Sequence, residues 1–217
     1  MTTQNLPGTN AARHGTGDAD LTIMIAAHDA FRRDLTRLAR TASAAHDPAR
    51  RESVQAGWEL FKRQLLLHHT TEDEIIWPAL RSRLAHSATA LSVLAAMEAE
   101  HELIDPLLAS VDAAFARQEP AADVIDALTS ALTGHLAHEE RDGLPLIGVA
   151  LTAAEWRGVG RKMASKNGLS AGSEMFAWIL DGADRDHSKA TLAQLPPPLR
   201  LLYRARWKPR FDKTPRW

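Results

Sequence analysis

The chain has 217 residues and a formal net charge of -1, with 26 Lys and Arg against 27 Asp and Glu. This balance provides no overall attraction to nucleic acid or to an anionic membrane, so no nucleic-acid partner is expected. Cys is absent, which excludes disulfides, zinc–thiolate sites and iron–sulfur clusters. A transition metal in this chain must therefore be held by His, Asp and Glu side chains.

The first 20 residues are polar and lack both the apolar core of a secretory signal peptide and the amphipathic, Arg-rich pattern of other targeting segments. We predict a disordered tail over residues 1–20. No run of about 18 apolar residues occurs, so no membrane span is expected and the protein is predicted to be cytoplasmic. Ala and Leu dominate the remainder and β-branched residues are scattered singly, which favours helix throughout.

The first expected helix begins after Asp20, whose side chain can cap a helix N-terminus. Apolar residues recur every three or four positions from Leu21 to Leu38, and His28 falls on this apolar stripe. A second helix is expected to start at Asp47-Pro48, an N-cap residue followed by a proline at the first helical position.

The apolar stripe of this second helix leads from Trp58 into His68 and Glu72, and the helix should end or kink near Pro78. A third helix, capped by Ser87, is expected to carry His101 on its apolar stripe. The fourth starts near Pro120, leads into His135 and Glu139, and should end around Gly143 to Pro145. Four helices joined by short loops predict an all-α, antiparallel up-down bundle over residues 21–150.

A helical extension is expected over residues 151–217. Thr152-Ala-Ala-Glu155 has the pattern of a capping box, Gly168 is an expected helix stop, and Leu195-Pro-Pro-Pro198 should break the chain. Residues 199–217 contain seven Lys or Arg against one Asp, with four interleaved aromatic residues: Tyr203, Trp207, Phe211 and Trp217. This tail either packs across its own domain with its aromatic rings buried, which we favour, or binds a protein partner.

Two stretches of the sequence repeat one pattern. In each, a His is followed four residues later by a Glu and ten residues later by a Pro: His68, Glu72 and Pro78, then His135, Glu139 and Pro145. Four residues make slightly more than one helical turn, so His and Glu share a face, about 6 Å apart. Each repeat therefore offers one nitrogen and one carboxylate ligand.

A pair of cations would explain the six residues on the inward stripes, which are His28, His68, Glu72, His101, His135 and Glu139. Two buried carboxylates require partners, because an unpaired buried charge is strongly disfavoured. If both carboxylates bridge two metals, each metal receives two His nitrogens and two carboxylate oxygens, and roughly two positions of an octahedron stay open. Open positions indicate a reactive centre rather than a purely structural one.

The order His, His-x3-Glu, His, His-x3-Glu, with a Pro six residues after each Glu, resembles the hemerythrin-like family, also called the HHE cation-binding domain. The resemblance covers about residues 21–150. It implies a four-helix bundle around a non-haem di-iron centre, with two iron ions joined by an oxo or hydroxo bridge. Carried over by motif position, the implied terminal ligands are His28, His68, His101 and His135, and the implied bridging carboxylates are Glu72 and Glu139.

The sequence departs from the oxygen-carrying members of the family, which have a fifth His one turn away from the third-helix His. Here those positions hold Met97 and Asp105, and Asp105 is either a substitute ligand or, as we favour, a solvated residue. His69 and His138 form alternative pairs with acidic residues but break the repeat, so we interpret them as lying outside the ligand group. His14, His46, His86 and His187 are expected to be solvated.

The resemblance predicts a protein that binds or reduces a small oxidant or diatomic gas, such as oxygen, peroxide or nitric oxide. Fewer protein nitrogens make peroxidase- or catalase-like activity, or nitric oxide chemistry, more probable than oxygen storage. Manganese and zinc stay open as alternatives to iron, because both accept nitrogen and oxygen ligands. The other hypothesis is a metal or redox sensor that signals to a protein partner through the C-terminal extension.

Overall fold

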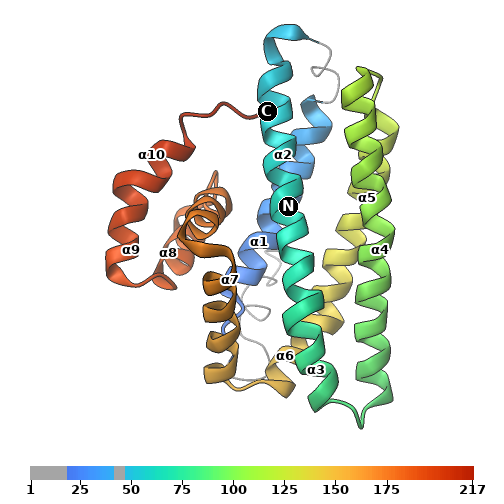
Figure 1. The fold of residues 1–217 in the computed structure, drawn as a ribbon, viewed down its shortest axis with the longest axis vertical. Coiled ribbons are helices and arrows are strands. Elements are labelled where there is room, and N and C mark those ends of the chain that lie inside the picture. Colours follow the sequence, from blue (N-terminus) through green and yellow to red (C-terminus); the bar gives the residue numbers. More distant parts are fainter. Residues whose placement is uncertain (1–18, 42–46) are drawn as a thin grey trace, which may run out of the picture.

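The computed structural model describes residues 19–41 and 47–217 (Figure 1). Every regular element in these residues is a helix. The predicted disordered tail lies almost entirely outside the described residues. None of the described helices is long and apolar enough to cross a lipid bilayer.

Four long helices form the bundle: α1 (Thr22–Thr41), α2 (Pro48–Thr71), α4 (Ala88–Arg117) and α5 (Ala122–His138). Consecutive helices run in opposite directions, and α1 packs against both α2 and α5 (Figure 1). Two of the expected N-caps are confirmed, because Asp47 accepts a hydrogen bond from the Ala49 N–H and Ser87 accepts one from the Ala90 N–H. The predicted all-α bundle is confirmed.

Neither of the helices that carry the two Glu residues ends at its proline, although the sequence predicted an end or a kink there. Each continues through one π-helical turn, η2 (Glu72–Ile76) or η3 (Glu139–Gly143), into a further helix, α3 (Trp77–Arg83) or α6 (Leu144–Ala150). In a regular α-helix Pro78 would have no N–H for the Glu74 carbonyl, and its ring would clash with that carbonyl. The wider turn, in which the Trp77 N–H donates to the Glu72 carbonyl, accommodates the proline.

The interior of the bundle consists of two apolar clusters with a layer of His and Glu side chains between them. One cluster contains Trp58 and Phe61, and the other contains Trp77 and Leu94. On α1, His28 falls between Met24 of one cluster and Phe31 of the other, and the corresponding His residues of the other helices lie at the same level. Polar side chains in such a layer are sealed from water by apolar packing above and below.

The C-terminal extension, residues 151–217, contains α7 (Ala153–Ile179), α8 (Arg185–Ala193), α9 (Pro197–Leu202), the π-turn η4 (Tyr203–Trp207) and α10 (Lys208–Phe211). The predicted capping box is confirmed, since Thr152 and Glu155 bond each other's backbone N–H. Gly168 interrupts α7 with φ 74° and ψ 174°, a conformation that favours glycine, and the helix then resumes. The division of the chain into two units near residue 150 stays a prediction.

A buried polar contact anchors the extension to α1. The Asp34 carboxylate, 1% exposed, accepts a hydrogen bond from the Trp178 indole Nε1–H at 2.7 Å. Arg33 and Arg37 pair with the other Asp34 oxygen, and Arg33 also donates to the Trp178 carbonyl. Trp178 is therefore fixed in position by both its ring and its backbone.

The last residues of the chain cross back to α2 as a strap (Figure 1). The Trp217 ring lies directly on Gly57, and the Trp217 N–H donates to the Ser53 carbonyl at 3.1 Å. Tyr203 and Phe211 are buried in the apolar cluster that contains Trp58 and Phe61. The favoured interpretation of the tail, with its aromatic rings packed on its own domain, is confirmed.

Candidate metal centre

The six predicted ligand residues meet at one level of the bundle. They come from α1, from the α2–η2 junction, from α4 and from the α5–η3 junction: His28, His68, Glu72, His101, His135 and Glu139. Five of the six are buried, and the His68 side chain is 10% exposed. The ligand residues of both halves of the repeat therefore lie at the same level of the bundle.

One group of possible ligands consists of His28, His68, Glu72 and Glu139, each of which offers one ligand atom within 4.8 Å of those of the others. The Nε2 atom of His28 is 3.2 Å from Nε2 of His68 and 3.2 Å from Oε2 of Glu139. Nε2 of His68 is 3.1 Å from Oε1 of Glu72, as expected for residues one helical turn apart. Two nitrogens and two carboxylates surround a single position.

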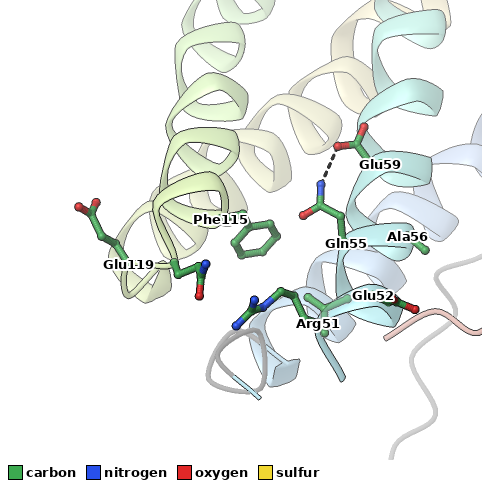
Figure 2. Close-up of a pocket in the computed structure, with 9 residues that line it drawn as sticks. Arg51, Glu52, Gln55, Ala56, Glu59, Phe115 and Glu119 are labelled. Carbon is green, nitrogen blue, oxygen red and sulfur yellow. Dashed lines mark hydrogen bonds between the residues drawn. The ribbon is translucent and has the colours of Figure 1, made fainter. Parts of the chain in front are cut away.

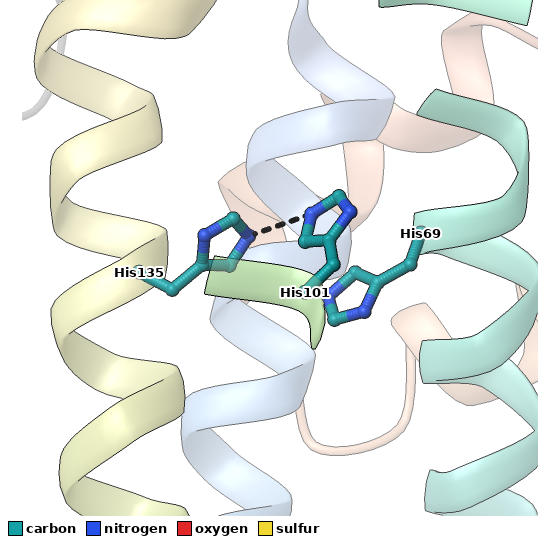
Figure 3. A group of neighbouring side chains, drawn as sticks. All are labelled: His69, His101 and His135. Carbon is teal, nitrogen blue, oxygen red and sulfur yellow. Dashed lines mark hydrogen bonds between the residues drawn. The ribbon is translucent and has the colours of Figure 1, made fainter. Parts of the chain in front are cut away.

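A second group consists of His69, His101 and His135, also within 4.8 Å (Figure 3). The Nε2 atoms of His101 and His135 are 3.2 Å apart, and the rings of His69 and His101 stack with centroids 3.9 Å apart. Oε2 of Glu72 lies 3.6 Å from Nε2 of His101, and Oε2 of Glu139 lies 3.9 Å from Nε2 of His135. Each Glu therefore contacts both groups, which is the arrangement that bridging carboxylates need.

The structure places His69 inside the bundle, beside histidines of the predicted ligand group, where the sequence interpretation did not expect it. His69 is 5% exposed and its ring reaches both His101 and His135. Only His68 has a Glu four residues later, so the repeat in the sequence indicated His68 alone as a ligand. A helix in a bundle buries a face at least 100° wide, so adjacent residues can both point inward. His68 contacts His28 of α1 and His69 contacts His101 of α4, so a fifth histidine lies beside the predicted ligands.

Other residues weighed from the sequence lie outside both groups. Asp105 is exposed on α4, and Met97 is buried in the apolar cluster that contains Trp77. His138 is 25% exposed, and its Nδ1 lies 2.7 Å from Oε1 of Glu100. Of the remaining histidines, His86 and His187 lie on the surface. His14 and His46 lie outside the described residues.

Three carboxylates that the sequence reasoning missed contact the outer nitrogens of three of the predicted ligand histidines. They face Nδ1 of His28, His101 and His135, while Nε2 of each ring points to the centre. The pairs are His28 with Glu140 at 2.9 Å, His101 with Asp73 at 3.0 Å, and His135 with Glu100 at 2.9 Å. The sequence held a signal for two of them, because an acidic residue directly follows each Glu of the repeat.

Six buried polar atoms at the centre make no hydrogen bond of good geometry among the described residues, although two of the oxygens lie within 3.2 Å of a His Nε2 atom. They are both oxygens of Glu72, both oxygens of Glu139 and both ring nitrogens of His69. Leaving a buried polar group unpaired costs about 1–3 kcal/mol, and more when the group is charged. Metal cations coordinated by these atoms would satisfy all of them, and this donor set of nitrogen and oxygen suits transition metals. The residues present therefore fit a pair of metal ions.

Burial and neighbouring charges shift the pKa values of the central groups. Burial raises the pKa of Glu72 well above its usual value, and the nearby Glu139 carboxylate raises it further. Burial would lower the pKa of His28, but Glu139 and Glu140 beside it raise it to about 9. Burial also lowers the pKa values of His68 and His69, which keeps their nitrogens neutral. Protons thus balance charge at a centre whose neutral imidazoles are ready to bind metal.

A groove on the surface is separate from this centre. It lies between the start of α2 and the end of α4, and Arg51, Gln55 and Phe115 are among its lining residues (Figure 2). Val54, also in its lining, and His69 are 15 positions apart on α2, which corresponds to about 22 Å along the helix axis. The groove holds none of the ligand residues.

The hemerythrin HHE cation binding domain family matches residues 19–147. This match covers more than half of the chain, and the chain belongs to the hemerythrin-like family, as the resemblance implied. The bundle is therefore a cation-binding helical domain. No curated protein and no solved structure shows a significant match to the chain.

Proposed function

We propose that the chain binds two iron ions at this centre and uses them to bind or reduce a small oxidant or diatomic gas. The observation that supports this most directly is a pair of buried carboxylates that lies between two groups of His nitrogens. The four oxygens of these carboxylates make no hydrogen bond of good geometry among the described residues. Family membership supports cation binding. The choice of iron is our inference from a sulfur-free donor set arranged for two ions of high coordination number.

In this proposal His69, His101 and His135 would hold one ion, His28 and His68 would hold the other, and Glu72 and Glu139 lie where they could serve both. When bound, the iron pair supplies redox chemistry and open coordination positions for a small ligand. The group with two histidines offers fewer protein nitrogens, so more coordination positions would remain there for that ligand.

The side chains around the centre restrict what can reach it. Phe31 covers the His68 ring at a centroid distance of 5.2 Å, and the apolar cluster with Trp77 and Met97 lies on the other side. Glu72 and Glu139 are both 0% exposed. Such an enclosure favours small inorganic ligands over larger organic substrates.

Metal analysis and absorption spectroscopy test the proposal. Protein loaded with Fe(II) without oxygen, desalted and then exposed to air should contain about two iron ions per chain and show ligand-to-iron absorption in the near ultraviolet. Less than about half an ion per chain would contradict it. Steady-state assays with peroxide, oxygen and nitric oxide would then identify the ligand.

A second candidate function, metal sensing through the C-terminal extension, is favoured by one set of ring contacts. Phe31 contacts the His68 ring at 5.2 Å and the Trp178 ring at 4.8 Å between centroids. Trp178 belongs to the extension and is fixed to Asp34. A change in the position of His68 on metal binding would therefore reach the extension through one aromatic side chain.

Limited proteolysis of the extension, with and without iron, tests this candidate. Sensing requires the rate of cleavage within residues 199–217 to change on metal loading, and replacement of Phe31 with Leu to weaken that change. Equal rates in both states would leave metal chemistry as the only function.

A further inference from the structure

We propose that Asp73, Glu100 and Glu140 are positioning residues, which orient three of the ligand histidines and so set how tightly the centre retains its metals. The inference rests on the proposed function, since it concerns the same centre. It assigns roles to three residues that are not themselves ligands.

The geometry of each ring supports this role. Nδ1 of His28, His101 and His135 lies 2.9–3.0 Å from a carboxylate oxygen, and Nε2 of the same ring faces another ligand atom of the centre. A histidine that donates its Nδ1–H to a carboxylate keeps its lone pair on Nε2 and cannot rotate freely. Such outer contacts also make the ligand nitrogen more basic.

Two of the contacts are exchanged between the two halves of the repeat. Asp73 directly follows Glu72 in the first half but contacts His101 of the second. Glu140 directly follows Glu139 in the second half but contacts His28 of the first. In both halves the two consecutive carboxylates begin one π-turn, so a single local structure directs one acid inward to the metals and the next acid to a neighbouring ring.

Two of the positioning carboxylates, Glu140 and Glu100, are themselves held in place. The Arg32 guanidinium donates to Glu140 at 2.7 Å, and His138 contacts Glu100 at 2.7 Å. This gives His138, which the repeat left without a role, a place in the support of the centre. The side chains of Asp73, Glu100 and Glu140 are 25–38% exposed, so each lies at the edge of the bundle rather than among the ligands.

Two of the proposed ligands, His68 and His69, lack this support. No carboxylate contacts Nδ1 of His68 among the described residues, and His68 is also the ligand with the greatest exposure. The reason is visible in the repeat: Glu100 precedes His101 and reaches His135, whereas the residue that precedes His28 is Ala27. The two halves of the repeat therefore differ in which carboxylates hold their histidines.

The test compares Asp73→Asn, Glu100→Gln and Glu140→Gln with the wild type. Each amide has nearly the shape of the acid it replaces and can still accept the Nδ1–H, so the fold is preserved while the charge is lost. Glu98→Gln is the matched control, because Glu98 is a partly exposed acid of α4 that pairs with Arg81 and does not contact the centre. Fe(II) and Zn(II) affinities are measured by competition with a chelator, and the melting temperature is measured on the metal-free proteins.

We expect each of the three variants to bind both metals about 10–100-fold more weakly, with the control unchanged. The metal-free melting temperatures should stay within about 2 °C of the wild type. Affinities within twofold of the wild type would overturn the inference while leaving the proposed function intact. A weaker affinity matched by an equal loss of metal-free stability would also overturn it, by assigning the carboxylates to folding. A wild type that binds neither metal would overturn the proposed function as well.

Discussion

Replacement of Glu72 with Met should stabilise the metal-free protein and weaken metal binding in the same variant. Glu72 is 0% exposed, and neither of its oxygens makes a hydrogen bond of good geometry among the described residues. Burying such a group costs about 1–3 kcal/mol, and a methionine of similar volume carries no such penalty. A chain of this length changes its melting temperature by about 2–4 °C per kcal/mol, so we expect an increase of roughly 2–12 °C.

With metal present, the same substitution should lower the stability that the protein gains from metal binding, relative to the wild type. Metal at 100 times its dissociation constant stabilises the wild type by about 2.7 kcal/mol, and a thioether cannot bridge two ions in place of a carboxylate. Differential scanning calorimetry of both proteins, with and without metal, should therefore show the variant more stable without metal and much less responsive to it. The control is Glu74→Gln, an exposed acid two residues away that pairs with Lys166 and should change stability by less than about 0.5 kcal/mol. A metal-free variant less stable than the wild type, with its response to metal unchanged, would refute the reasoning.

Two further substitutions test the fifth histidine and the strap. His69→Ala should lower metal affinity at least about tenfold in a chelator competition, because it removes one of three nitrogens from its group, whereas the exposed His86→Ala should not change it. Equal affinities in these two variants would place His69 outside the ligand set. Gly57→Ala would put a Cβ 2.6 Å from the Trp217 ring, so trypsin should cleave the displaced strap faster. Gly134→Ala, whose Cβ meets nothing within 4 Å, should leave cleavage unchanged and add up to about 1 kcal/mol of stability; faster cleavage in this control would exclude a specific strap contact.

The architecture could be predicted from the sequence because its determinants are local. The apolar residues recur with the helical period on all four bundle helices, and the Asp47 and Ser87 caps mark two helix starts. The two-part repeat, read as ligands on inward faces, placed six side chains at one level of the bundle. The structure brings all six together without further assumptions.

The role of the prolines was harder to infer. A proline in a helical pattern predicts an end or a kink, because it lacks the N–H of an α-helical bond. The sequence gives no sign that bonds to the residue five positions back would carry the helix past Pro78 and Pro145. That turn matters for the site, because it begins at Glu72 in one half and at Glu139 in the other.

His69 and the three outer carboxylates were missed for a different reason. A search for one repeated register keeps one residue per helix, whereas a bundle helix contacts two neighbours and buries a broad face. His69 became visible only once α4 was placed beside α2. Glu100 likewise reaches His135 on a neighbouring helix, a contact that no spacing within one helix reveals.

The iron content of the wild type and of Glu72→Met tests the central claim most directly. Both proteins would be loaded with Fe(II) without oxygen, desalted and analysed by mass spectrometry of the metal together with amino-acid analysis. The account predicts about two ions per chain in the wild type and a clearly lower ratio in the variant. Less than about half an ion in the wild type, or the same ratio in both proteins, would contradict it.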